Sequence, residues 1–202
     1  MKYNGPKVRL SRRLGIALTP KAQRIMEKKP YPPGEHGQRR ARRTSVYQQQ
    51  LREKQRLRMQ YNVSERQLRI YVKRATKQSG NTVDRLAQQL ETRLDALVLR
   101  AGMAQTIYAA RQLVGHGHIE VDGRRVDIPS YQVRVGQWFR VRPRSRRIPQ
   151  VVEAWEVATI GAPVSYVTRS KKDFSASLTD VPSRDDIPVI CEIPQVVEFY
   201  SK

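Results

Sequence analysis

Two histidines separated by one residue, His116 and His118, stand out in the stretch ARQLVGHGHIEVDGRRV, residues 110–126. An imidazole can bind a metal, transfer a proton, or donate hydrogen bonds to phosphate and ribose. A metal site needs further ligands, but the chain has 3 histidines and a single cysteine, Cys191. A catalytic pair needs a nucleophile and an orienting acid, and nothing else in the sequence nominates them. The residue types therefore favour contact with a polyanion.

Arginines border the histidines on both sides. Arg111 precedes them, and Arg124 with Arg125 follows them. Gly115 and Gly117 allow the chain to reverse from a helix into a strand, because glycine adopts backbone conformations that other residues avoid. We interpret this stretch as a turn within an RNA-binding face. Loop histidines without any contact are the plainer alternative.

Two short helices and a small sheet are predicted to position this turn. Thr92 and Thr106 can cap helices that end near Gly102 and Gly115. The sequence HIEVDGRRV alternates polar and apolar residues around Asp-Gly, a favoured two-residue hairpin turn. The pattern predicts an α+β fold, with two helices packed on a short, twisted antiparallel sheet.

Residues 46–92 are predicted to form a helical domain. Helices are expected from Ser45, Ser64 and Thr82, and the second has a capping-box pattern. Many cations lie off the apolar stripes, which indicates binding to nucleic acid, although a cationic helix face is often only solvated surface. The candidate RNA-binding residues here are Arg52, Lys54, Arg56, Arg58, Arg66, Arg69 and Lys73.

Residues 1–45 are predicted to be a basic, weakly structured, extended arm. Prolines and glycines between residues 30 and 37 exclude a helix there. The arm is either a disordered basic tail or a segment that folds against phosphates. Its candidate RNA-binding residues are Arg39, Arg40, Arg42 and Arg43.

The overall charge also indicates a polyanionic partner. The 202 residues have a formal net charge of +21, and most of the excess lies before residue 150. A membrane is the weaker candidate partner, because no apolar run reaches the ~20 residues of a spanning helix and no secretory signal is visible. With one cysteine, no intramolecular disulfide can form, so we expect a cytosolic protein.

Several motifs resemble one known family. The stretches RLDALVLRAGMA and ARQLVGHGHIEVDGRRVDIPSYQV closely resemble the RNA-binding module of the small-subunit ribosomal protein S-four family. PYPPGEHGQRR, QLREKQRLR, SERQLRIYVKRA, LETRLD and the terminal VVEFYSK resemble the ribosomal protein itself. The resemblance implies a module over residues 93–153 and a segment 154–202 that packs back on the helical domain. It places these residues on the RNA-facing side: Arg93, Arg100, Arg111, His116, His118, Arg124 and Arg125.

The resemblance also implies a function. Such proteins are non-enzymatic primary binders of the 5′ domain of small-subunit ribosomal RNA, which nucleate assembly of the subunit body and contribute to translational accuracy. The implied partners are that RNA, proteins S-five and S-twelve, and messenger RNA along the path by which it enters the ribosome. No cofactor and no homo-oligomer are expected, and the location is the small subunit of a cytoplasmic, or alternatively organellar, ribosome. Many bacterial members hold zinc with four N-terminal cysteines; Val8, Ser11 and Arg24 occupy three corresponding positions here, so no metal is expected.

Two alternatives belong to other classes. An RNA-modifying enzyme could use the same module, but residues 143–202 offer little room for a catalytic domain. A basic chaperone or DNA-binding protein of low specificity would share the charge. Competition by duplex DNA distinguishes this last class from a specific RNA-binding protein.

Overall fold

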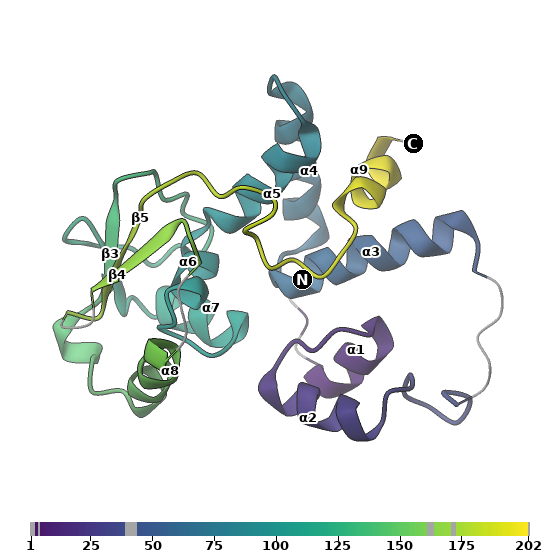
Figure 1. The fold of residues 1–202 in the computed structure, drawn as a ribbon, viewed down its shortest axis with the longest axis horizontal. Helices are drawn as coiled ribbons and strands as arrows, with labels where there is room; N and C mark the ends of the chain where they lie inside the picture. The colour runs from purple at the N-terminus through teal and green to yellow at the C-terminus, as the bar shows by residue number, and fades with distance from the viewer. Residues whose placement is uncertain (1–2, 4, 39–43, 161–163, 171–172, 202) are drawn as a thin grey trace. The chain divides into compact units, whose positions relative to one another are not determined.

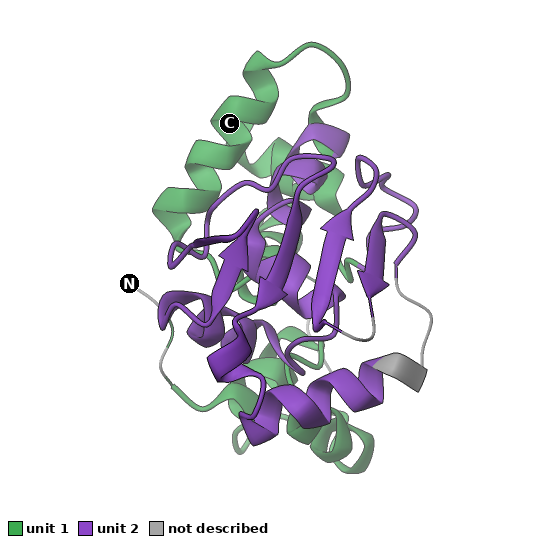
Figure 2. Ribbon diagram, turned by 90° about the vertical axis from the view of Figure 1, so that its left-hand side faces the viewer, with its two compact units in different colours: residues 1–83, 189–202 green, residues 84–188 purple. Residues whose placement is uncertain are grey.

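The structure, a computed structural model, describes residues 3, 5–38, 44–160, 164–170 and 173–201. The chain divides into two compact units, shown in Figure 2: unit 1 contains residues 1–83 and 189–202, and unit 2 contains residues 84–188. Helices and an antiparallel sheet are both present, which confirms the α+β class. This division differs from the four segments expected from the sequence.

Unit 1 is helical. Its helices are α1 (Lys7–Leu14), α2 (Pro20–Lys28), α3 (Val46–Gln60), α4 (Glu65–Lys77) and α9 (Ile193–Ser201). α3 begins with a capping box in which the Ser45 and Gln48 side chains each bond the other residue's backbone N–H. Ser64 caps α4 by accepting a hydrogen bond from the Gln67 N–H at 3.2 Å, so both helices begin where the polar cap residues predict.

The first 29 residues differ from the expected weakly structured arm. They contain α1 and α2, and the buried side chains of Leu10, Leu14 and Ile16 form a small core with Met59 of α3. Thr19 caps α2, and Pro20 occupies its first turn, where proline is well tolerated. The apolar stripe is short and lies among many cations, so its periodicity is weak in the sequence. Residues 30–38 contain no helix, in agreement with their prolines and glycines.

Helix α9 completes unit 1 by packing against α3 (Figure 1). The rings of Tyr47 and Phe199 lie 5.7 Å apart, and the Gln50 amide donates to Glu198 at 2.9 Å. Ile193 and Val196 are buried in this packing. A segment distant in the sequence therefore contributes to the core of unit 1.

Unit 2 is built around an antiparallel sheet with strand order β2-β1-β3-β5-β4. The strands are β1 (Ile119–Val121), β2 (Arg124–Arg125), β3 (Trp138–Val141), β4 (Val167–Ser170) and β5 (Ser175–Leu178). The helices are α5 (Thr82–Glu91), which starts at the unit boundary, α6 (Leu94–Arg100), α7 (Ile107–Gly115), η1 (Pro143–Ser145) and α8 (Pro149–Ile160). Asp122 and Gly123 both have positive φ, 47° and 78°, as the predicted hairpin turn requires.

The sheet is larger than the sequence predicts. β5 pairs with β3, and β4 pairs with β5, so residues 167–170 and 175–178 extend the sheet. The C-terminal segment 154–202 therefore does not act as one body: its first part belongs to unit 2, and only α9 and the residues before it belong to unit 1. Short strands with few β-branched residues, such as SASL in β5, give little signal in the sequence.

Candidate RNA-binding surface

The two histidines lie in the turn that joins α7 to β1. Gly117 has a φ of 72°, a conformation that favours glycine, and it is buried. A Cβ at this position would lie 2.2 Å from Nε of Arg125, so the glycine also makes room for that guanidinium. The His116 and His118 rings are 6.0 Å apart. The predicted reversal from helix to strand is therefore present, with Arg125 packed against it.

A second segment joins this turn. The backbone N–H of Arg142 donates to the carbonyl of His118 at 2.9 Å, and Nδ1 of His118 lies 2.9 Å from Oγ of Ser145 in η1. The Arg142 guanidinium donates to the Gly117 carbonyl at 3.4 Å. These bonds bring Arg142 next to the histidines, and Arg144, which precedes Ser145 in the chain, is exposed. The arginine cluster after Pro143 is visible in the sequence, but no sequence pattern near it predicts that it contacts the turn.

We refer to these residues as the histidine-turn surface, which comprises His116, His118, Arg124, Arg125, Arg142 and Arg144. Acidic groups near it already have partners. Asp122 accepts from the Gln137 amide at 2.6 Å and from the Trp138 N–H at 3.2 Å. Asp127 forms an exposed ion pair with Arg125 at 3.6 Å, and exposed pairs of this kind contribute little to the stability of a protein. With four arginines against these two carboxylates, the surface carries a cationic excess that suits phosphate.

The environment of His118 lowers its pKa below the usual range. Burial is the main cause, and repulsion from His116, Arg142 and Arg125 adds to it. At neutral pH the ring is therefore uncharged and acts as a hydrogen-bonding group. The arginines, which are always protonated, supply the charge.

We expect a proton NMR titration of the free protein to give His118 a midpoint below ~6.5, the value of an unperturbed histidine. Because the unfolded state binds this proton more readily, the free energy of unfolding should fall as the pH drops from about 6.5 through the folded pKa. Arg125→Ala removes one repelling charge and should raise the midpoint. A midpoint at or above ~6.5 in the unsubstituted protein would contradict this account.

Three other predicted RNA-binding residues form ion pairs inside unit 2. Arg93 is only 1% exposed and donates two hydrogen bonds to Asp95, at 2.9 and 2.5 Å. Its guanidinium is therefore enclosed in unit 2 and paired with a carboxylate, where the sequence suggested an RNA contact. Arg111 also binds Asp95, at 3.2 Å, and Arg100 forms a mostly buried ion pair with Glu91. These pairs connect α5 to α6 and α6 to α7, the helix that ends at the turn.

In unit 1, too, some of the predicted RNA-binding residues form ion pairs within the protein. Lys54 and Arg58 both pair with Glu65, and Lys54 is buried. Arg56 binds Glu53 and the Leu14 carbonyl, at 2.7 and 2.8 Å, which ties α3 to α1.

The remaining candidates of unit 1 fall into two groups. Arg52, Arg66, Arg69 and Lys73 are exposed and available to a ligand. Four candidates lie outside the described residues: Arg39, Arg40, Arg42 and Arg43.

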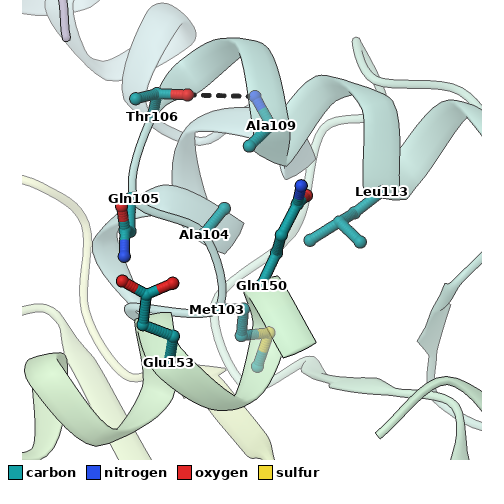
Figure 3. Close-up of a pocket in the computed structure, with 8 residues that line it drawn as sticks. All are labelled: Met103, Ala104, Gln105, Thr106, Ala109, Leu113, Gln150 and Glu153. Carbon is teal, nitrogen blue, oxygen red and sulfur yellow. Dashed lines mark hydrogen bonds between the residues drawn. The ribbon is translucent and has the colours of Figure 1, made fainter. Parts of the chain in front are cut away.

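Figure 3 shows a pocket of about 310 Å³ in unit 2, between the start of α7 and α8. Glu153 and Gln150 of α8 and Gln105 line it together with Met103 and Leu113. Its charged lining residue is an acid, so it does not extend the cationic surface. Within the described part of the chain, no group of three or more histidine, cysteine or acidic residues could hold a metal ion. No helix among those residues is long and apolar enough to cross a membrane.

Comparison with known proteins identifies the family. Residues 2–91 match the model of the ribosomal protein S4/S9 N-terminal domain, and residues 92–139 match that of the S4 domain. The chain is 48% identical over 203 residues to the small ribosomal subunit protein uS4 of Thermobifida fusca, with 100% of both chains covered. Proteins of the same name from Micrococcus luteus and Bifidobacterium animalis subsp. lactis are 49% and 51% identical, over 96% of this chain and 95% and 96% of theirs. The chain therefore belongs to the small ribosomal subunit protein uS4 family.

Proposed function

We propose that this protein is a structural constituent of the small ribosomal subunit and binds small-subunit ribosomal RNA. The observation that carries the proposal is the histidine-turn surface, where the turn holds His116 and His118 beside Arg125 and Arg142. Arg124 and Arg144, which adjoin these segments in the chain, are exposed. The names of the relatives and the net charge of +21 support it. Exposed cations on α3 and α4 supply a second cationic surface, on unit 1.

The proposal includes the finer role that the resemblance implies. The protein binds a multi-helix junction of the 5′ domain early, nucleates assembly of the subunit body and contributes to translational accuracy. Its neighbours are proteins S-five and S-twelve and the messenger RNA entering the ribosome. It acts in the cytoplasm or in an organelle, without enzymatic activity, cofactor or homo-oligomer. Arginines and an uncharged histidine fit this role, because they bind phosphate and ribose and need no reacting group.

Affinity in this proposal comes mainly from phosphate neutralisation, with release of counterions. Specificity comes from the shape of the folded RNA, because the deep, narrow major groove of an A-form helix hides the identity of its bases from side chains. The Gly117 turn and its hydrogen bonds to Arg142 and Ser145 give the histidine-turn surface a fixed geometry. Such a surface recognises the spacing of backbone phosphates in a folded junction.

Filter binding to the 5′ domain of small-subunit ribosomal RNA, over a series of salt concentrations and with excess duplex DNA, tests the proposal. We expect binding that survives the competitor. The plot of log affinity against log salt concentration should fall with a slope of about 0.7–0.9 for each phosphate neutralised. Loss of binding in the presence of duplex DNA would contradict specific RNA recognition and favour a basic protein of low specificity.

A further inference from the structure

Unit 1 contains a groove of about 580 Å³ between α4 and α9, within the size range of ligand sites. Arg69, Val72, Lys73, Thr76 and Lys77 of α4 form one wall. The other wall is formed by Phe199 and Tyr200, near the end of α9. The groove is thus cationic on one side and aromatic on the other.

The cations of the first wall follow the helical repeat. Arg69, Lys73 and Lys77 are four residues apart, so they lie on one face of α4 and rise ~6 Å from one to the next. All three are exposed, and none has a carboxylate within ion-pair distance among the described residues. The acid of α4, Glu65, is in the first turn and is held by Lys54, Arg58 and the Tyr200 hydroxyl. This row of cations can contact successive phosphates of one strand.

The aromatic wall is fixed in position. The Tyr200 hydroxyl donates to Glu65 at 2.6 Å, and the rings of Phe199 and Tyr200 meet edge to face at 5.5 Å. The Lys54 ammonium lies 4.3 Å from the Phe199 ring centre, on the side of α3. Both aromatic side chains are still partly exposed and line the groove. An ordered, partly exposed aromatic pair is a suitable surface for a planar base.

We propose that this groove binds an unpaired nucleotide of RNA, with its phosphates on Arg69, Lys73 and Lys77 and its base against Phe199 and Tyr200. The inference rests on the proposed function and adds a site on unit 1 for a single-stranded segment. A duplex offers phosphates but keeps its bases stacked inside, so it would use only the cationic wall. An acidic peptide could use the same cations, but it has no planar base for the aromatic wall.

The test uses the full chain and a single-stranded RNA of six nucleotides, five adenosines and one photoreactive 4-thiouridine. After irradiation and proteolysis, mass spectrometry should find the crosslink on the peptide that contains Phe199 and Tyr200. A blunt duplex with the same photoreactive base should crosslink there much less. Fluorescence anisotropy over a series of salt concentrations gives the affinity for the same probe.

Three variants make the test specific. Lys73→Gln should reduce the slope of log affinity against log salt by about 0.7, the value for one phosphate of a single strand. Arg74→Gln is the matched control, because Arg74 is the next residue on α4, is also exposed, and does not line the groove; its slope should stay unchanged. Phe199→Leu should weaken binding and the crosslink by about fivefold or more, through loss of stacking, with thermal melting as a check on folding.

The outcomes separate the two proposals. If the unsubstituted protein fails to hold the 5′-domain RNA against duplex DNA, the proposed function is wrong. If it holds that RNA but the crosslinks map elsewhere, or if Lys73→Gln and Arg74→Gln behave alike, only the groove assignment is wrong. A crosslink from the duplex to the Phe199 and Tyr200 peptide as strong as that from the hexanucleotide, or equal affinity for an acidic peptide, would likewise overturn it.

Discussion

Asp95→Asn should lower the free energy of unfolding of unit 2 by about 3–5 kcal/mol, the usual cost of breaking a buried ion pair from one side. The Asp95 carboxylate is fully buried and binds both Arg93 and Arg111, at 2.5 and 3.2 Å. Its Oδ1 also accepts from the Ala96 N–H at 3.0 Å. Asparagine keeps the shape but not the charge, so the buried Arg93 guanidinium and the partly exposed Arg111 guanidinium would both lose this carboxylate.

Urea denaturation followed by tryptophan fluorescence measures this effect. The chain has 2 tryptophans, Trp138 and Trp155, and both lie in unit 2, so the signal reports that unit. Asp127→Asn is the control, because it removes a carboxylate from an exposed pair with Arg125 and should cost under ~1 kcal/mol. Equal losses in the two variants would show that the buried pairs do not stabilise unit 2.

The double variant Arg124→Gln, Arg125→Gln should weaken binding to the 5′-domain RNA by about 100-fold, since a hydrogen bond to a charged group contributes ~1.5 kcal/mol. Both arginines are exposed on β2, and Arg125 lies against the Gly117 turn. The slope of log affinity against log salt should fall by about 1.4–1.8, for two phosphates. The salt-titrated filter-binding experiment measures both quantities.

The control for this variant is Arg85→Gln, Arg184→Gln, which removes two exposed charges from unit 2 outside the histidine-turn surface. It lowers the net charge equally, so it shows how much of the loss comes from the general field of the protein. Nearly unchanged binding is expected for it. Equal losses in the two double variants would remove the special role of the histidine-turn surface.

Local sequence signals predicted the turn well. Gly117, the alternation around Asp122-Gly123 and the capping threonine Thr106 all act within a few residues of where they stand. The structure has the helix, the reversal and the hairpin at these positions. The same holds for the starts of α3 and α4, where Ser45 and Ser64 are the caps.

The roles of single cations could not be predicted in the same way. Arg93 and Arg124 are both arginines in a basic module, but one meets a buried carboxylate and the other meets solvent. Lys54 lies among exposed cations in the sequence, yet the turn after α3 brings Glu65 back to it. Which cation finds an acid depends on tertiary packing, and so does the pairing of β5 with β3. Charge patterns therefore predict the partner class better than the individual contacts.

The packing of α9 on α3 has a consequence for protein synthesis. Residues 189–202 belong to unit 1, although all of unit 2 separates them from residues 1–83. Because translation runs from the N-terminus, α3 emerges from the ribosome long before Ile193 and Val196 exist to cover it. Unit 2 comes from one continuous stretch and meets no such delay. We therefore expect unit 2 to fold while the chain is still growing, and unit 1 to close last although most of its sequence is made first.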